Sequence, residues 1–431
     1  MTKVTQDSAA ARLIARRDRL MGSAYRLFYE KPIHLVKGEG VWLYDASGKK
    51  YLDMYNNVPH VGHCHPHVVE ALTKQIRTLN THTRYLHENV LDYAERLTEK
   101  FPDELDVAMF SCTGSEANEL ALRIARAHTG ATGIIVTDLA YHGNTHAIYQ
   151  ISTEDIPQAE IPDFVISVPA PDTYRGAYRG DDAGERYAAH IETAIDELCG
   201  RGVKPAAFVV DTIISSSGVV SPPPGYLKKA AEIIRAAGGL FVADEVQPGF
   251  GRTGKNFWGF EADEIAPDIA TMGKPMGNGQ PLAATVTRTD IVERFSKKAS
   301  YFNTFGGNPV SCAAGLAVLD VIETENLQLN ALEVGRYLIG GLNDLATRHE
   351  SIGDIRGSGL FLAVDLVNDR ETREPATETT SRVVNGLRDR GILTGSIGPG
   401  DNVLKLRPPM VFSTENADYF LGIADDVLTG V

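Results

Sequence analysis

The sequence predicts an α/β protein with a mainly parallel sheet, and three observations support this fold class. Short apolar segments alternate along most of the chain with longer segments of helical periodicity. Most of the apolar segments are continuous, which is typical of strands buried on both faces of a parallel sheet. The 431 residues are 43% hydrophobic and 23% charged, which is enough for a large core in two or three subdomains.

The chain begins with a predicted helix at residues 11–30 and an extended region at 33–53, in which DASGKK supplies a hairpin turn. Helical periodicity returns at 67–100. The strands that follow are VAMF (107–110), GIIVTD (133–138), AAFVVDT (206–212), LFVADEV (240–246), DIATM (268–272) and LAATVTR (282–288). The clearest helices between them are predicted at 115–128 and 224–237.

The last part of the chain predicts a smaller α/β domain. A long helix starts near Pro309 and runs past Ile322, and later helices alternate with strands at 359–367 and 403–407. Residues 369–379 are predicted to form a polar loop. GDIRGSGLF (353–361) lacks the spacing of a glycine-rich nucleotide loop and is interpreted as a tight turn before a strand.

The amino-acid composition indicates which partners and which cellular location to expect. Lysine and arginine number 42 and aspartate and glutamate 56, so the net charge is −14. An acidic chain without a basic block is a poor binder of nucleic acid. The four cysteines are scattered without a CxxC pair, which is typical of a reducing compartment. No signal peptide or membrane span is recognisable, so we expect a cytoplasmic protein without a membrane partner.

Polar residues stand at the ends of several predicted strands, where ligands bind in open parallel sheets. Asp244 ends one apolar strand and Gln247 follows it, while Tyr141 and His142 come just after another. A third strand passes through Thr113-Gly114-Ser115 into a helix, whose free N–H groups would suit a phosphate.

The segment DIATMGKPMGNGQPLAA (268–284) holds a single lysine, Lys274, among apolar and small residues. A lysine there loses hydration, which favours the neutral amine that can form a Schiff base with an aldehyde. Each residue also has an ordinary alternative: Lys274 could reach the surface, Asp244 could form a salt bridge, Tyr141 could be a rim aromatic, and Thr113 could begin a capping box. Together, however, they supply the parts that pyridoxal 5′-phosphate (PLP) requires.

Six motifs in a fixed order carry a resemblance over nearly the whole chain. They are GHCHPHV (62–68), TGSEANELALRIAR (113–126), YHG (141–143), FVADEVQPGFGRTG (241–254), TMGKPMGNGQP (271–281) and FNTFGGNPVSCAAG (302–315). The chain resembles the class III (ω-type) PLP-dependent aminotransferases of fold type I. The resemblance implies a large PLP-binding domain with a mainly parallel sheet at 56–320, and a smaller α/β domain formed by the N-terminal 1–55 and C-terminal 321–431 segments.

The resemblance also implies a role for each matching residue. Lys274 matches the Schiff-base lysine that moves the Cα proton. Asp244 matches the carboxylate that keeps the pyridine nitrogen protonated. Tyr141 matches the residue that stacks on the ring, with His142 beside it in the YHG motif. Gln247 matches the residue near the ring hydroxyl.

The cofactor phosphate has its own matching residues. Gly114 and Ser115 match the residues that hold it, and Thr304 would reach it from a partner subunit. Because the family builds each active site at a dimer interface, we expect a homodimer with shared active sites, or a tetramer.

Two departures from the family pattern concern the keto-acid acceptor. Where the aminotransferases carry a Glu-Pro pair, this chain has Asp211-Thr212. In NVLKLRPPM (402–410), Lys405 occupies the position of the arginine that binds the acceptor carboxylate, and Arg407 follows two residues later. A lysine lacks the planar fork that binds a carboxylate through two hydrogen bonds, so 2-oxoglutarate is not expected to be the acceptor.

Further stretches resemble one branch of the family, the phospho-lyases that act on ethanolamine phosphate or phosphohydroxylysine. They are YNNVPHVGHCHP (55–66), LNTHTRYLHENV (79–90), PAPDTYRGAY (169–178), TMGKPMGNG (271–279) and NVLKLRPPM (402–410). The branch implies that Lys274 removes a proton from the amine-bearing carbon and that phosphate leaves from the adjacent carbon. We expect O-phosphoethanolamine as substrate, giving acetaldehyde, ammonia and phosphate, because it has no carboxylate.

The phosphate of such a substrate needs cations on an acidic chain. We expect Arg84, Arg26 and Lys405 to provide them, with Asn57 adding a hydrogen bond. Surface or interface salt bridges are the alternative role for Arg84 and Arg26.

Three other functions are considered. An ω-aminotransferase with an amine donor and a keto-acid acceptor would share every cofactor residue. A zinc site in HVGHCHPH (60–67) would lack a second ligand pair at fixed spacing, so no metal is expected. An inactive binding protein is disfavoured because Lys274 and Asp244 are both present. Glu245 is expected to point away from Asp244 and is given no role.

Overall fold

Seven strands form the central sheet of the computed structural model, which describes residues 9–154 and 156–431. In spatial order they are β4 (Val107–Ser111), β10 (Ala283–Thr287), β9 (Ile269–Met272), β8 (Leu240–Asp244), β7 (Pro205–Asp211), β5 (Gly133–Thr137) and β6 (Val165–Val168). β10 pairs antiparallel with β4 and β9, and the other neighbours pair in parallel. The predicted α/β class with a mainly parallel sheet is therefore confirmed.

Helices cover both faces of this sheet. Successive residues of a strand point to opposite faces, so each strand contributes side chains to the contacts with both helical layers. α4 (Gly114–Thr129) packs on one face, against residues such as Val242. α6 (Ala183–Gly200) and α7 (Tyr226–Ala236) pack on the other face, against residues such as Phe241. The strand residues that continue the first series beyond Val242 therefore face α4 at the carboxyl end of the sheet.

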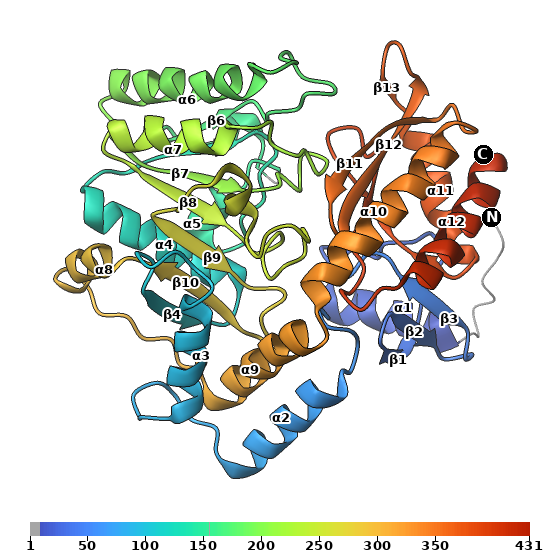
Figure 1. Cartoon of the computed structure of the whole chain (residues 1–431), viewed down its shortest axis with the longest axis horizontal. Coiled ribbons are helices and arrows are strands. Elements are labelled where there is room, and N and C mark those ends of the chain that lie inside the picture. Colours follow the sequence, from blue (N-terminus) through green and yellow to red (C-terminus); the bar gives the residue numbers. More distant parts are fainter. Residues whose placement is uncertain (1–8, 155) are drawn as a thin grey trace.

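Two smaller sheets lie beside the central one (Figure 1). The first combines β1 (Leu35–Glu39), β2 (Trp42–Asp45) and β3 (Lys50–Asp53) with β14 (Ile392–Leu393), which pairs in parallel with β3. The second contains β11 (Ile352–Ser358), β12 (Phe361–Asp369), β16 (Val403–Leu406) and β15 (Gly395–Ile397), with β13 (Glu374–Pro375) paired to β12. Strands from both ends of the chain thus share one sheet, while the division into domains stays a prediction.

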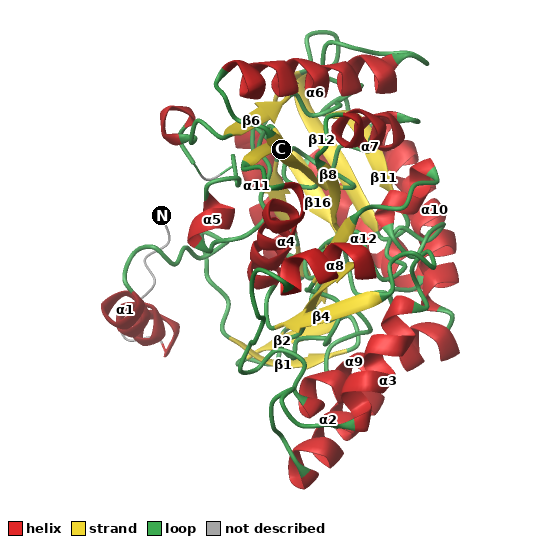
Figure 2. Cartoon of the chain, turned by 90° about the vertical axis from the view of Figure 1, so that its left-hand side faces the viewer, coloured by secondary structure: helices red, strands yellow, loops and turns green. Residues whose placement is uncertain are grey.

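The remaining helices lie around these sheets (Figure 2). They are α1 (Ala9–Met21), α2 (Pro66–Thr78), α3 (Glu88–Thr98), α5 (His146–Tyr149), η1 (Gln158–Glu160), η2 (Gly259–Asp263), α8 (Thr289–Ser296), α9 (Pro309–Thr324), α10 (Leu327–Ala346), α11 (Thr377–Asp389) and α12 (Thr414–Thr429). α2 and α3 both pack against α9, and α10 packs against α12. Over the described ranges, no helix combines the length and hydropathy needed to cross a bilayer.

The helix predicted at residues 11–30 is wrong beyond Met21. The N–H of Gly22 donates to the carbonyl oxygen of Asp18 at 3.2 Å, and Gly22 has a φ of +73°. A glycine in this left-handed conformation closes the last turn of a helix and directs the chain away from the helix axis. The helical region predicted at 67–100 is likewise two helices, α2 and α3, separated by residues 79–87.

The polar loop predicted at 369–379 is also wrong in part. β12 continues to Asp369, β13 returns antiparallel to it, and α11 begins at Thr377. The carboxylate of Asp369 accepts the N–H of Thr372 at 2.7 Å and so stabilises the turn between the strands. The tight turn predicted in GDIRGSGLF is confirmed, since Ser358 pairs with Phe361 across two residues. β6 and α6 are additional elements that were not predicted from the sequence.

Candidate active site

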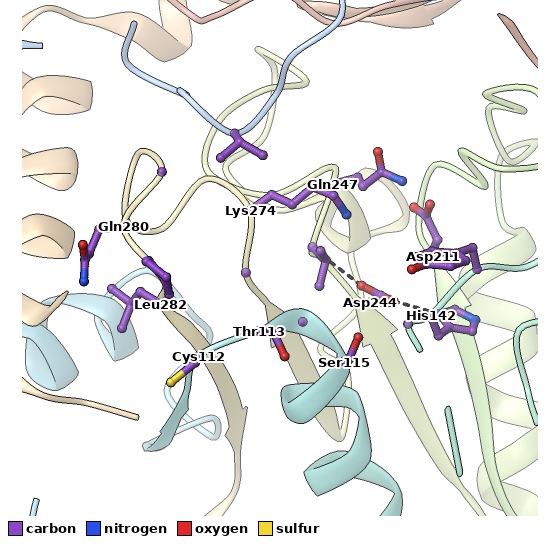
Figure 3. A pocket seen from close by; sticks show the side chains of 18 residues that line it. Cys112, Thr113, Ser115, His142, Asp211, Asp244, Gln247, Lys274, Gln280 and Leu282 are labelled. Carbon is purple, nitrogen blue, oxygen red and sulfur yellow. Dashed lines mark hydrogen bonds and ion pairs between the residues drawn. The ribbon is translucent and has the colours of Figure 1, made fainter. Parts of the chain in front are cut away.

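The loops after the parallel strands bring together most of the residues predicted to bind a cofactor. They surround a cavity of about 270 Å³ (Figure 3). The predicted residues that line it are Gly114, Ser115, Tyr141, His142, Asp244, Gln247 and Lys274. These residues follow β4, β5, β8 and β9, so the cavity lies at the carboxyl edge of the sheet, the usual place for a ligand in this architecture.

Asp244 is buried at the end of β8, and hydrogen bonds hold both of its carboxylate oxygens. Oδ2 lies 2.7 Å from Nδ1 of His142 and accepts from Nδ2 of Asn118 at 2.9 Å. Oδ1 accepts the N–H of Val246 at 3.1 Å. Thr271 donates its hydroxyl to Oδ1 of Asn118 at 2.6 Å, which directs the NH₂ group of Asn118 toward Asp244. The orientation of this carboxylate is therefore set by residues of α4 and β9 and of the loops after β5 and β8.

The N-terminus of α4 lies at the edge of the cavity. Thr113 begins a capping box there, and the first N–H groups of a helix have no acceptors within the helix itself. A Cβ atom on Gly143 would lie 2.4 Å from Oγ of Ser115, and one on Gly273 would lie 3.2 Å from the backbone nitrogen of Gly114. Glycine at these positions lets the surrounding loops approach the helix N-terminus, which favours a bound anion.

Lys274 follows β9 and is half-buried beside the cavity. Burial lowers the pKa of its amine and the nearby charge of Arg407 lowers it further, while Asp244 and Asp211 act in the opposite direction. A lower pKa increases the fraction of neutral amine, which is the nucleophilic form. Figure 3 shows the lysine side chain extending toward Gln247.

Asp211 ends β7 directly opposite Asp244 in the register of the two strands, and it lines the same cavity. Its carboxylate accepts the N–H of Ile213 at 3.1 Å and that of Ser215 at 3.0 Å. Burial raises the pKa of Asp211 and the charge of Asp244 raises it further, while the hydrogen bonds from Ser215 lower it. The sequence marked this residue only as a departure from a family pattern, whereas the structure places it in the site.

Gln247 lines the cavity and is hydrogen-bonded to residues of three other segments of the chain. Its Nε2 donates to Oγ of Ser215 at 2.5 Å. Its Oε1 accepts from the guanidinium of Arg407 and, at 3.4 Å, from Nδ2 of Asn57. The guanidinium carbon of Arg407 also lies 4.6 Å from the ring centroid of Tyr55, within the range of a cation–π contact. Gln247, Arg407, Asn57 and Tyr55 therefore form one connected group next to Lys274.

The remaining predicted site residues are outside the cavity lining of the single chain. They are Arg26, Asn57, Arg84, Thr304 and Lys405. Arg26, Arg84 and Thr304 are exposed, and the guanidinium carbon of Arg84 lies 3.9 Å from the ring centroid of Phe302. Lys405 is buried, and its Nζ lies 3.4 Å from the carbonyl oxygen of Ser215. Asn57 approaches the cavity through Gln247.

Two contacts of this site were not predicted from the sequence: that of Asn118 with Asp244 and that of Arg407 with Gln247. Asn118 lies one helical turn after Gly114, so helix periodicity could have placed it on the same face. Lys405 and Arg407 are alternate residues of an extended segment and point to the same side. Spacing alone could not decide which of the two contacts Gln247.

The histidines of residues 60–67 have other partners. Nε2 of His60 bonds to the carbonyl oxygen of Phe250 and its Nδ1 to Arg252. The partners of the other three are Asp53 for His63, Glu325 for His65 and Asp320 for His67. Within residues 9–154 and 156–431, no three His, Cys, Asp or Glu side chains are grouped to hold a metal ion.

Glu245 turns away from its neighbour Asp244. Its carboxylate accepts the hydroxyl of Thr212 at 2.8 Å and the N–H groups of Gly259 and Phe260 at 2.8 and 3.0 Å. Adjacent carboxylates at the end of β8 therefore have separate environments, one in the cavity and one against η2.

Comparison with protein families identifies the family. A family model described as aminotransferase class-III matches residues 28–428. The chain belongs to the class-III aminotransferases. The family is PLP-dependent, and its known structures have the type I fold of PLP enzymes.

Class-III relatives with different printed activities match nearly the whole chain. An alanine–glyoxylate aminotransferase 2-like protein of Drosophila melanogaster is 44% identical over 429 residues, covering 97% of this chain and 87% of the relative. An ethanolamine-phosphate phospho-lyase homolog of Caenorhabditis elegans is 40% identical over 435 residues, covering 97% and 93%. These names include both an amino-transfer and an elimination activity.

Solved structures of class-III enzymes have the same architecture. A phospholyase from Arthrobacter in complex with phosphoethanolamine has a TM-score of 0.94 and 44% identity, covering 97% of this chain and 100% of that one. An amine transaminase from an uncultivated Pseudomonas species, solved in its PLP-bound form, has a TM-score of 0.87 and 30% identity, covering 95% and 98%.

Proposed function

We propose that this protein is a PLP-dependent phospho-lyase that eliminates phosphate from a phosphorylated amine, with O-phosphoethanolamine as its substrate. One molecule of substrate and one of water give acetaldehyde, ammonia and inorganic phosphate. The carbon–oxygen bond to phosphate breaks, and water ultimately replaces the amine nitrogen. The electrons balance within the substrate, so no oxidant or keto acid is consumed.

The observation that carries this proposal is the match to a phospholyase solved with phosphoethanolamine. The two chains agree in fold and in 44% of their residues over the full length of that structure. The departures at Asp211-Thr212 and Lys405 agree with it, since both lie where a keto-acid aminotransferase needs its carboxylate-binding machinery. An enzyme that uses no keto acid does not require that machinery.

The donor set of the cavity fits PLP. Gly143 and Gly273 lie so close to the start of α4 that a Cβ atom on either would contact it. Because both are glycines, the N–H groups at the start of this helix stay available to the phosphate of PLP. Asp244, oriented by His142 and Asn118, would face the pyridine nitrogen. The other residues assigned to the cofactor are Gly114, Ser115, Tyr141 and Gln247, with Thr304 contributed by a second subunit. When bound, PLP supplies an electron sink for the charge that develops at the amine-bearing carbon.

Lys274 is the proposed proton carrier. Its lowered pKa makes the neutral amine available to take a proton from the amine-bearing carbon. With PLP bound, Asp244 would stabilise a positive charge on the pyridine nitrogen and so help the ring accept the electrons released at the amine-bearing carbon. Asp244 is buried, and burial strengthens electrostatic interactions of this kind.

A homodimer is part of the proposal. Large apolar side chains are exposed beside Arg26, on residues 79–91 and on residues 302–305: Tyr25, Leu27, Phe28, Leu79, Tyr85, Leu86, Leu91, Phe302 and Phe305. A surface of this kind is typical of a protein–protein interface. A second copy covering it would bring Arg84, Arg26 and Thr304 toward the cavity of the first, where Arg84 and Arg26, with Lys405 and Asn57, would bind the substrate phosphate.

The alternative is a class-III ω-aminotransferase. The similarity to alanine–glyoxylate aminotransferase 2-like proteins favours it, and those relatives match the chain as completely as the phospho-lyase homolog does. Such an enzyme would use the same cofactor residues with an amine donor and a keto-acid acceptor.

A substrate comparison separates the two functions. The purified protein, loaded with PLP, is incubated with O-phosphoethanolamine, with phosphohydroxylysine, or with alanine and a keto acid. A phospho-lyase releases inorganic phosphate from one of the phosphorylated amines without a keto acid. An aminotransferase produces amino acid only after pyruvate, glyoxylate or 2-oxoglutarate is added.

A further inference from the structure

Arg407 is a buried cation whose hydrogen-bonding capacity is only partly used. Its residue is 7% exposed. The guanidinium donates to the neutral side chain of Gln247 and rests against the ring of Tyr55. Its Nε has no hydrogen-bond partner among residues 9–154 and 156–431. A buried guanidinium that carries an unpartnered N–H is unusual, because desolvation of such a group is costly.

No carboxylate of the described residues lies within ion-pair distance of the Arg407 guanidinium, whereas the half-buried Arg356 pairs with Asp354 and Asp365. Burial lowers the pKa of Arg407, and the more distant carboxylates of Asp53 and Asp211, together with Tyr55, only partly oppose this effect. Among the described residues, Arg252 is another buried arginine without an ion pair, but its guanidinium donates to the carbonyl oxygens of Leu360 and Pro408. Arg407 differs because its visible acceptor is an exchangeable side-chain amide.

The position of Arg407 is next to the reacting groups. It contacts Gln247, which lines the cavity, and it is close enough to Lys274 to lower the pKa of that amine. Lys405, on the same side of the strand, has its Nζ near the carbonyl oxygen of Ser215 and 5.5 Å from the ring centroid of Phe361. Arg407, two residues after the family's arginine position, is therefore the one of the two that is hydrogen-bonded to a residue of the cavity lining.

We infer that Arg407 is a further residue that binds the anionic end of the substrate, exchanging the oxygen of Gln247 for an oxygen of the anion. A phosphate offers several acceptors to the Nε–Nη fork, and a charged acceptor binds more strongly than a neutral amide. The contact with the ring of Tyr55 restricts the movement of the guanidinium. The identity of the anion as a phosphorylated amine rests on the proposed function, but the anion site itself does not.

The test compares four holoenzymes: the natural chain, Arg407→Gln, Arg407→Lys and Arg390→Gln. Arg390 lies in an exposed pair with Asp426, so its variant is a control for the loss of one positive charge. Inorganic phosphate is titrated into each by calorimetry, with acetate in parallel, and the visible absorbance of bound PLP confirms loading. Propylamine, which has no anionic end, is then used in single-turnover reactions, and KM and kcat are measured with O-phosphoethanolamine.

The inference predicts that Arg407→Gln weakens phosphate binding and raises KM for O-phosphoethanolamine by about 10-fold or more, from the loss of charged hydrogen bonds. Because Arg407 lies near Lys274 and contacts Gln247, its replacement also changes the propylamine reaction, but by a smaller factor than it raises KM for O-phosphoethanolamine. Arg407→Lys, which keeps the positive charge, recovers part of the phosphate affinity. A merely structural role would change the propylamine rate and the KM for O-phosphoethanolamine by the same factor, and that result would overturn the inference. Equal phosphate binding by Arg407→Gln and the natural chain, or none by the natural chain, would also overturn it.

The proposed function fails separately from this inference. If the natural chain binds phosphate through Arg407 but transfers amine groups instead of releasing phosphate, the anion site stands and the phospho-lyase assignment is wrong. Tighter binding of acetate than of phosphate would assign the site to a carboxylate substrate. If phosphate is released while every Arg407 variant keeps the same KM, the function stands and Arg407 is not its anion-binding residue.

Discussion

Nδ1 of His142 lies 2.7 Å from Oδ2 of Asp244, and both side chains are buried at the carboxyl edge of the sheet. The imidazole must donate from Nδ1 when it is neutral, because the carboxylate is an acceptor. Nε2 of His142 has no partner in the described part of the chain, so the ring is oriented through Asp244 alone. His142 therefore acts as a positioning residue for the carboxylate assigned to the pyridine nitrogen.

Replacing His142 with Phe keeps the ring volume and removes the hydrogen bond to Asp244. We expect PLP affinity and kcat to fall by about 10-fold, the cost of one hydrogen bond to a charged group. Titration of the apoprotein with PLP, followed by visible absorbance, measures the affinity, and Asp244→Asn should show a larger loss. If His142→Phe binds PLP and turns over like the natural chain, His142 does not position Asp244.

The Lys274→Ala variant tests the residue assigned to proton transfer. The variant should lose the visible absorbance of lysine-linked PLP, and kcat should fall by at least about 10²–10⁴-fold, the usual contribution of a general base. Absorbance spectra and product assays of the same preparation provide the measurement. Lys255, which is exposed on the loop before η2, offers a matched lysine control. Activity or absorbance retained in Lys274→Ala would remove the central residue of the proposed site.

Arg84 tests whether a second subunit completes the site. Arg84→Ala should raise KM for the phosphorylated amine by about 10-fold or more, since a charged hydrogen bond is lost. Mixing Arg84→Ala chains with Lys274→Ala chains then allows mixed dimers to form. If Arg84 serves the partner, the site that retains Lys274 receives an intact Arg84, and activity reappears. An unchanged KM in Arg84→Ala would show that Arg84 does not bind the substrate, and no recovery on mixing would place it in its own subunit's site.

Much of this site was predictable because its functional residues stand at or just after the ends of strands. Parallel strands end on one edge, so Asp244, Tyr141 and Lys274 could be placed near one another from the order of apolar segments alone. Contacts between segments distant in sequence could not be predicted in this way. The hydrogen bond of Asn118 to Asp244 depends on how α4 packs on the central sheet, and that of Arg407 to Gln247 depends on where the segment after β16 meets the loop after β8.

The end of the first helix could not be predicted from the sequence pattern either. Helical periodicity alone extended it to residue 30, yet it ends at Met21 because Gly22 adopts a left-handed conformation. Glycine is tolerated inside helices as well as after them, so its presence did not decide the boundary. The backbone conformation of Gly22 did.

Glu245 gives a prediction about stability and pH. Burial raises its pKa from 4.5 to about 8, although the hydrogen bonds from Gly259 and Thr212 lower it. Since the folded-state pKa lies above the unfolded value, folding favours the protonated carboxyl. This contribution is complete below pH 4.5 and is lost as the pH rises toward 8.

The comparison uses Glu245→Gln, which cannot ionise. The free energy of unfolding of the natural chain should decline between pH 5 and pH 8 relative to that of Glu245→Gln, as measured by denaturant titration at several pH values. Parallel pH dependences for the two proteins would mean that Glu245 has the same protonation behaviour in the folded and unfolded chains.

The central claim, elimination rather than amino transfer, is tested most directly by product stoichiometry without any keto acid. PLP-loaded protein is incubated with excess O-phosphoethanolamine, and inorganic phosphate, acetaldehyde and ammonia are each counted per active site over time. A phospho-lyase forms the three products in equal amounts and over many turnovers. If no phosphate is released and the bound cofactor instead accepts one amine group per site, waiting for a keto acid, the protein is an aminotransferase and the account is wrong.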